Sequence, residues 1–131
     1  VSDVGIMVAG MVGMGDRVDD VRHLVRRRLA NRAHHNFRYT LETVPAAERA
    51  GVQKLLDNFD VTKPIEERAD PNLITDYLLN RFAIAGSAEE CIARVKKLEA
   101  AGVNHLIMTP PEIGYTDVME RWAKEVMPHF K

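Results

Sequence analysis

The feature that most constrains the fold is the stretch from Phe82 to Pro111, FAIAGSAEECIARVKKLEAAGVNHLIMTPP. It contains two short apolar runs of the kind that form buried strands, separated by an amphipathic run. Ser87 and Glu90 have the S-x-x-E spacing of a capping box, which predicts that a helix begins there. Gly102 follows the amphipathic run, where a residue with a left-handed backbone commonly ends a helix. A strand, a helix and a second strand in this order predict a βαβ unit with parallel strands.

The beginning of the chain predicts a third strand. The run DVGIMVAG at residues 3–10 is nearly continuous in apolar residues, which is typical of a strand covered on both faces. Gly13 and Gly15 follow and predict a loop, and Asp16 is then placed to cap a helix. Residues 33–45 fit either a short helix or an irregular turn.

Further helical patterns lie before the second strand and at the end of the chain. Residues 45–59 carry apolar side chains at helical spacing, and Asp70 followed by a proline predicts another helix start. Asp117 and Glu120 again have capping-box spacing before the last helix, which Pro128 stops. Val118, Trp122 and Val126 are predicted to face inward from this helix. The whole order is strand, helix, helical insertion, strand, helix, strand, helix. This order predicts an α/β fold with a parallel sheet.

The composition fits one ordinary domain of 131 residues, 46% of them hydrophobic. The net charge of −1 gives no reason to expect a nucleic acid or an anionic membrane as a partner. The single cysteine, Cys91, cannot form an internal disulfide, which favours a cytoplasmic location. No apolar run reaches the about 18 residues that span a membrane. The sequence begins without a methionine and almost at once with a strand-like run, as the continuation of a longer chain would.

A family resemblance rests on the same stretch. The residues that carry it are Phe82–Gly86, Ser87, Glu89, Glu90, Ala101–Val103 and Leu106–Pro110, together with the ending VMPHFK. This pattern resembles the C-terminal part of the luciferase-like monooxygenase superfamily. Its members are flavin- or deazaflavin-dependent (coenzyme F-420) oxidoreductases and include methylenetetrahydromethanopterin reductases. The resemblance is good over residues 74–131, looser over residues 1–35 and poor over residues 36–72.

The resemblance implies a (β/α)₈ TIM barrel, a fold that needs about 250 residues. The chain, one domain over residues 1–131, would then hold the last three strand–helix units plus a helical insertion at about 36–72. The five other strands would belong to a longer chain or to another chain. The resemblance also implies FMN or coenzyme F-420 as the cofactor of the complete barrel, held largely by the earlier strands. We therefore expect no tight cofactor binding by this chain alone, and association with the missing barrel portion or with further copies.

Barrel enzymes form their active sites from the segments that follow each strand. The corresponding residues, predicted to line part of a substrate pocket or its rim, are Met11, Val12, Gly13, Ala85, Gly86, Thr109 and Pro110. The substrate is expected to be a small molecule. The sequence contains no residue pattern that we identify as catalytic or as a metal site.

Three motifs have both a structural and a functional interpretation. Gly86 and Ser87 at a helix start would suit a phosphate, but the acidic first turn favours a simple cap. The glycines of GMVGMG at residues 10–15 lack the order of a dinucleotide-binding loop, which favours a loop at the barrel mouth. The run Arg26–Arg28 favours a solvated helix face over a phosphate clamp.

Histidines and methionines allow similar alternatives. His34 and His35 are adjacent, so on a helix they point apart and make a poor metal pair. His105 lies in a predicted strand. It is either a core or rim histidine, which is the default interpretation, or a proton shuttle. Met11 and Met14 either line an apolar pocket at the end of the first strand or fill the core.

Two functions remain open from the sequence. In the first, the chain is the C-terminal portion of a flavin- or deazaflavin-dependent oxidoreductase or monooxygenase and is inactive as this fragment alone. In the second, it is a truncated, non-catalytic relative that acts as an oligomerisation or binding module.

Overall fold

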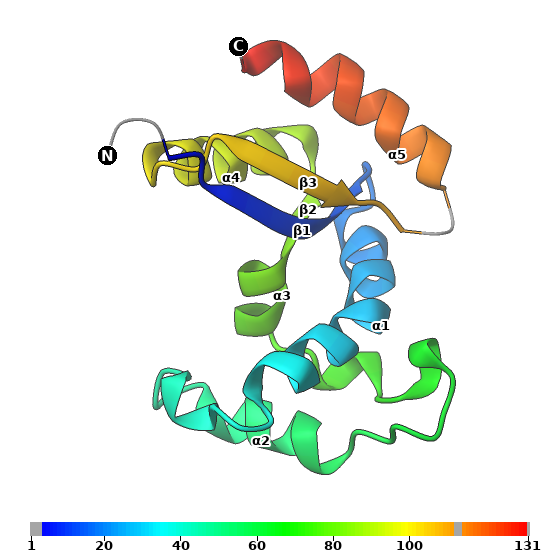
Figure 1. The fold of residues 1–131 in the computed structure, drawn as a ribbon. Helices are drawn as coiled ribbons and strands as arrows, with labels where there is room; N and C mark the ends of the chain where they lie inside the picture. Colours follow the sequence, from blue (N-terminus) through cyan, green and yellow to red (C-terminus); the bar gives the residue numbers. More distant parts are fainter. Residues whose placement is uncertain (1–3, 112–113, 131) are drawn as a thin grey trace. The chain divides into compact units, whose positions relative to one another are not determined.

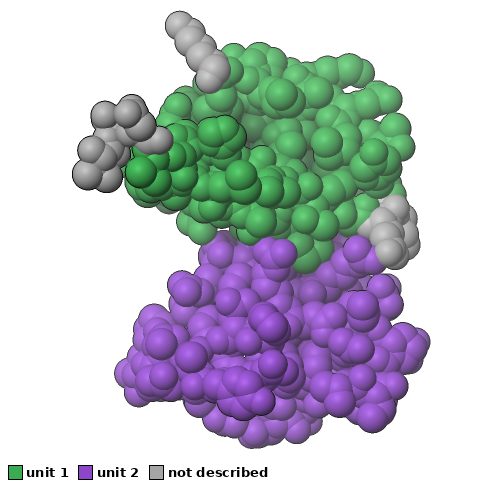
Figure 2. Space-filling model, in the orientation of Figure 1, with its two compact units in different colours: residues 1–22, 83–131 green, residues 23–82 purple. Residues whose placement is uncertain are grey.

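The structure is a computed structural model that describes residues 4–111 and 114–130. The chain divides into two compact units (Figure 2). Unit 1 comprises residues 1–22 and 83–131 and contains the strands, whereas unit 2 comprises residues 23–82 and contains helices joined by turns. Helix α1 (Val18–Phe37) begins in unit 1 and continues in unit 2.

The sheet of unit 1 has three parallel strands, β1 (Met7–Met14), β2 (Ala83–Gly86) and β3 (His105–Thr109), in the order β2-β1-β3 (Figure 1). The parallel pairing confirms the prediction from the alternating pattern of strands and helices. Strand β2 pairs with residues 11–14 of β1, and β3 pairs with residues 7–11. In a barrel wound in chain order β2 and β3 would be neighbours, whereas here both flank β1. The strand order therefore differs from that expected of three consecutive barrel units.

Helices cover one face of this sheet. They are α4 (Ala88–Ala100) and α5 (Tyr115–Arg121), and the latter continues as a π-helical turn (Trp122–Val126) and a 3-10 turn (Met127–His129). The core between sheet and helices consists of Val12, Met14, Ile84, Cys91, Val118, Trp122 and Val126. The inward positions predicted for the last helix are confirmed, and Met14 fills the core instead of lining an open pocket.

The opposite face of the sheet is partly bare. Side chains alternate along a strand, so Met7 and Ile107 project away from the covered face. Met7 is 60% exposed and Ile107 is 50% exposed. Among the described residues, the outer edges of β2 and β3 also have no strand paired to them. Unit 1 thus presents an apolar sheet face and two strand edges that a larger sheet would cover.

Unit 2 contains the rest of α1, α2 (Arg49–Asp57) and α3 (Asp76–Phe82). Its 3-10 turns are Leu41–Thr43, Ile65–Glu67 and Pro71–Leu73. Leu29, Val52, Leu55 and Leu78 are fully buried, in accordance with the helical spacing of apolar residues. None of the helices in the described ranges combines the length and the apolar character needed to cross a membrane.

Polar contacts join α1 to later segments of unit 2. The Arg26 guanidinium pairs with the Asp76 carboxylate and donates to the Ile74 carbonyl oxygen at 3.2 Å. Arg28 pairs with Glu66 at 3.4 Å. The prediction of a merely solvated face for Arg26–Arg28 is therefore wrong for two of the three arginines, because their guanidinium groups satisfy partners across the unit.

Several element boundaries differ from the predicted ones. Strand β1 runs to Met14, beyond the predicted run of residues 3–10, so Gly13 lies inside the strand instead of in a loop. Pairing with Ala85 of β2 holds Gly13 extended. Helix α1 continues through residues 33–37, which resolves the ambiguous segment, and α2 begins at Arg49, later than the pattern indicated.

Two predicted helix starts are also wrong. The Asp70 carboxylate accepts from the Asn72 N–H at 2.9 Å, but it caps a 3-10 turn, and α3 begins only at Asp76. Helix α5 begins after Gly114, whose φ of 74° is accessible at little cost only to glycine. Asp117 therefore lies in the first turn of α5, where its charge suits the helix dipole, and does not form a capping box.

Candidate functional site

The carboxyl ends of the three strands bring the predicted rim residues together. Gly13 pairs with Ala85, and Met11 pairs with Thr109. Beyond the last strand pair, the Gly15 N–H donates to the Gly86 carbonyl oxygen at 3.3 Å, which holds the loop after β1 against the end of β2. Ala85, Gly86 and Thr109 end their strands, and Pro110 follows directly.

The placement of Met11, Val12 and Gly13 in a loop after the first strand is wrong, because all three lie within β1. Val12 is fully buried in the core beneath α4 and α5, so its side chain is not part of an open rim. Met14 and Gly15 take the expected position at the strand end instead. The extension of β1 to Met14 was not predicted, because a glycine-rich segment is typical of a loop. The rim role of Ala85, Gly86, Thr109 and Pro110 stays a prediction.

The N-terminus of α4 has a complete capping box. The Glu90 N–H donates to Ser87 Oγ at 3.3 Å, and the Ser87 N–H donates to Glu90 Oε2 at 2.8 Å. The other carboxylate oxygen of Glu90 accepts from Arg22 at 2.8 Å. The Glu90 carboxylate also lies so close to Gly86 that a Cβ there would be 2.2 Å from its oxygen. A carboxylate already occupies the helix end, and its charge opposes a bound phosphate.

We expect Ser87→Ala to lower the free energy of unfolding by about 0.5–2 kcal/mol, the usual cost of removing a side-chain N-cap. Ser87→Thr keeps the acceptor oxygen and is expected to lose only a few tenths of a kcal/mol. Urea unfolding followed by circular dichroism measures both. Ser87→Ala with wild-type stability, or Ser87→Thr as damaging as Ser87→Ala, would contradict the capping role.

An ion cluster fastens the loop after β1 to the last helix. Arg121 donates to Asp16 at 3.0 Å and to both carboxylate oxygens of Glu125, at 2.8 and 3.2 Å. The hydrogen bonds that Arg121 donates to Glu125 and Asp16 raise the pKa of Arg121, and the same bond to Glu125 lowers the pKa of that carboxyl group. Asp16, predicted as a helix cap, thus holds the loop in place through Arg121. Three arginines near this edge, Arg17, Arg22 and Arg121, are each paired with a carboxylate.

Cys91 and the histidines show no catalytic arrangement. Cys91 is buried, its thiol donates to the Gly13 carbonyl oxygen at 3.8 Å, and burial followed by the Glu90 charge raises its pKa to about 11. A thiol with such a pKa is protonated at neutral pH and is a weak nucleophile. His34 stacks on the Phe59 ring with centroids 4.0 Å apart. Within the described ranges, no three potential metal ligands come together.

His105 lies at the opposite end of β3 from the predicted rim. Its Nδ1 is 2.9 Å from Asn104 Oδ1, which also accepts from the Ile6 N–H at 2.9 Å. The histidine is exposed and stands beside the bare face of the sheet. His105 is therefore a rim histidine only at the amino end of β3. Its side chain cannot act as a proton shuttle at the carboxyl end, where the predicted rim lies.

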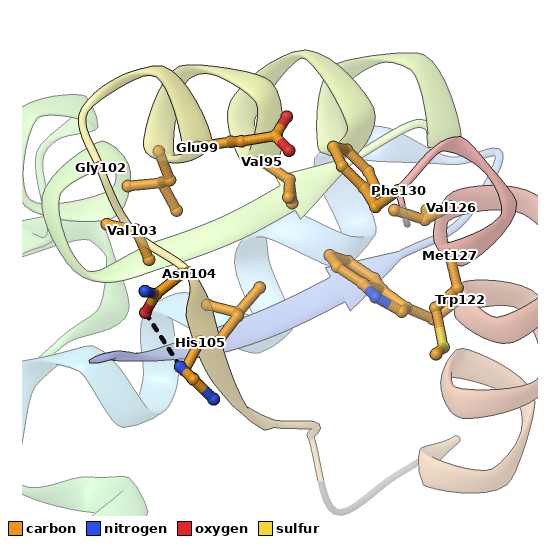
Figure 3. A pocket seen from close by; sticks show the side chains of 12 residues that line it. Val95, Glu99, Gly102, Val103, Asn104, His105, Trp122, Val126, Met127 and Phe130 are labelled. Carbon is orange, nitrogen blue, oxygen red and sulfur yellow. Dashed lines mark hydrogen bonds between the residues drawn. The ribbon is translucent and has the colours of Figure 1, made fainter. Parts of the chain in front are cut away.

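A pocket of about 670 Å³ lies elsewhere in unit 1, between the last turns of α4, the start of β3 and the C-terminal helical segment (Figure 3). Its walls are mainly apolar: Val95, Leu98, Val103, Leu106, Trp122, Val126, Met127 and Phe130. This pocket was not predicted from the sequence. Helical spacing correctly marks Val95, Leu98, Trp122 and Val126 as inward, but spacing does not reveal that the two helical segments leave a gap between them.

No protein-family model and no curated protein matches the sequence. A solved structure does match. It is the coenzyme F-420-dependent tetrahydromethanopterin reductase from Methanopyrus kandleri, which superposes with a TM-score of 0.73 at 17% sequence identity. The two chains share a fold. The match covers 99% of this chain but 37% of the reductase, so the chain spans little more than a third of the length of that protein.

The extent of the match adds to the resemblance seen in the sequence. Because it covers 99% of the chain, it includes residues 36–72, where the sequence resemblance is poor. A likeness at 17% identity shows a shared fold and no more. Which part of a barrel the chain represents stays a prediction.

Proposed function

We propose that this chain is part of a luciferase-like oxidoreductase whose complete barrel binds FMN or coenzyme F-420. In this proposal the chain is the C-terminal portion of the barrel and supplies part of the pocket for a small-molecule substrate. The observation that carries the proposal is the fold shared with the F-420-dependent reductase over nearly the whole chain. The bare sheet face and the unpaired edges of β2 and β3 support it, because additional strands would cover both.

The residues at the carboxyl edge do not fit the phosphate group of either cofactor. Glu90 occupies the N-terminus of α4, and Arg22 is paired with that same carboxylate. Arg121 is engaged by Asp16 and Glu125. The phosphate and the redox ring therefore require residues from the rest of the barrel. The small, uncharged residues at this edge suit a different role, the neutral wall of a substrate pocket, because small side chains let a substrate approach closely. These residues are Ala85, Gly86, Thr109 and Pro110.

The alternative is a truncated, non-catalytic relative that uses the bare sheet face for oligomerisation or binding. The same exposed residues, Met7 and Ile107, favour it, since an apolar face attracts a partner of any kind. The two proposals differ in whether the protein that carries this chain holds a cofactor.

The proposal is tested by titrating FMN and coenzyme F-420 separately into that protein, purified at its natural length. We expect saturable binding of one cofactor per complete barrel, which gel filtration does not remove. The 131-residue chain alone is expected to retain neither. Absence of binding by the natural-length protein would favour the non-catalytic alternative, and stoichiometric cofactor on the isolated monomer would contradict the need for further strands.

A further inference from the structure

The pocket between α4 and the C-terminal segment lies apart from the carboxyl-edge site. It is lined by Asn104, His105 and Leu106 at the start of β3, whereas the predicted rim lies at the end of that strand. All of its lining residues belong to unit 1. A volume of about 670 Å³ falls within the range of about 300–1,000 Å³ that is usual for small-molecule sites.

Trp122 gives this pocket a polar group. The residue is 3% exposed, and its ring extends from the C-terminal segment toward the middle of the pocket (Figure 3). Among the described residues, the indole N–H donates to no protein atom. In the same residues, every fully enclosed side-chain nitrogen or oxygen has a hydrogen-bond partner. The indole nitrogen therefore keeps some accessible surface, and Trp122 lines this pocket. A nearly buried donor on a residue that lines a cavity favours an occupant with a hydrogen-bond acceptor.

The remaining lining decides the charge of that occupant. Val95, Leu98, Val126 and Phe130 provide apolar walls for a hydrophobic body. Glu99 is the charged residue of the lining, and its carboxylate disfavours an anion such as a fatty acid or a phosphate ester. Lysine and arginine do not contribute to the described lining. An uncharged acceptor such as an amide or ketone carbonyl meets both conditions.

We propose that this pocket binds an uncharged small molecule with an apolar body and one carbonyl acceptor, which the Trp122 N–H recognises. This site does not depend on the proposed function, because it shares no residue with the carboxyl edge. The walls exclude water from the apolar body, and the indole supplies the single directional contact. Its occupant is thus distinct from the cofactor and the substrate of the barrel.

The chain offers a direct readout, because Trp122 is its single tryptophan. We would titrate the 131-residue chain with 4-phenylbutanamide, 4-phenylbutanoate and butylbenzene, which share a body and differ in the head group. We expect the amide to change the Trp122 emission saturably, and the other two to bind at least about tenfold more weakly. Equal affinity for the amide and butylbenzene, or no saturation by any probe, would overturn the proposal.

Variants separate this pocket from other apolar surfaces. Val95→Phe fills the pocket and is expected to abolish amide binding, whereas Ile107→Phe, on the bare sheet face, should leave it unchanged. Glu99→Lys, at an exposed position, is expected to remove the discrimination against 4-phenylbutanoate. Binding that survives Val95→Phe would overturn the proposal. The proposal would also be overturned if the Trp122 emission depended on protein concentration and Val95→Phe dissociated a dimer. The occupant of the pocket would then be a second copy of the chain.

Discussion

Replacing Val12 by aspartate is expected to unfold unit 1, whereas the same replacement of Met7, in the same strand, should leave the unit folded. Val12 is fully buried, and its side chain lies in the core between β1 and the covering helices. Burying an unpaired carboxylate costs several kcal/mol, which is a large part of the about 5–15 kcal/mol that stabilises a typical domain. Met7 is 60% exposed on the opposite face, so its replacement costs less than about 1 kcal/mol.

The tryptophan bands of the near-ultraviolet circular dichroism and the Trp122 emission measure this pair of variants, since the single tryptophan lies in the core of unit 1. The expected result is loss of both signals in Val12→Asp and retention of both in Met7→Asp. Equal tolerance of the two replacements would contradict the assignment of a covered and a bare face. In the natural-length protein we expect Met7→Asp to be damaging as well, because the bare face is then covered.

Local chemistry made part of this fold predictable from the sequence. Ser87 and Glu90 form the predicted capping box because the required atoms lie within one helical turn. Gly102 has the predicted left-handed backbone, with a φ of 91°, for the same reason. Helical spacing identified Val118, Trp122 and Val126 as core residues. Each of these features depends on neighbours in the sequence.

Features that depend on distant residues were not predictable. Gly13 lies in a glycine-rich segment typical of a loop, but pairing with Ala85 of β2 holds it in a strand. Hydrophobic periodicity also does not reveal that β1 lies between the other two strands. It indicates which residues are buried but not which residues they contact. At the candidate site, Arg22 and Arg121 look like free cations in the sequence. The fold brings carboxylates from distant segments to them.

The second large effect is expected at the edges of the sheet. Strand β1 is paired on both sides, whereas β2 and β3 are each paired on one side only among the described residues. An edge strand leaves alternate N–H groups without a ladder partner, and such amides exchange rapidly with solvent. If the complete protein adds strands at these edges, the outward amides of β2 and β3 become hydrogen-bonded and their exchange slows by about a hundredfold or more. Those amides of β1 that already bond to β2 or β3 serve as an internal control, because their partners are already present.

Amide hydrogen exchange, measured on the 131-residue chain and on the protein that carries it at its natural length, tests the central claim most directly. We expect strong additional protection of residues 83–86 and 105–109 in the natural-length protein, with those amides of β1 that already bond to β2 or β3 protected alike in both. Identical exchange at both edges in the two samples would contradict it, because the three-stranded sheet would then be complete as it stands.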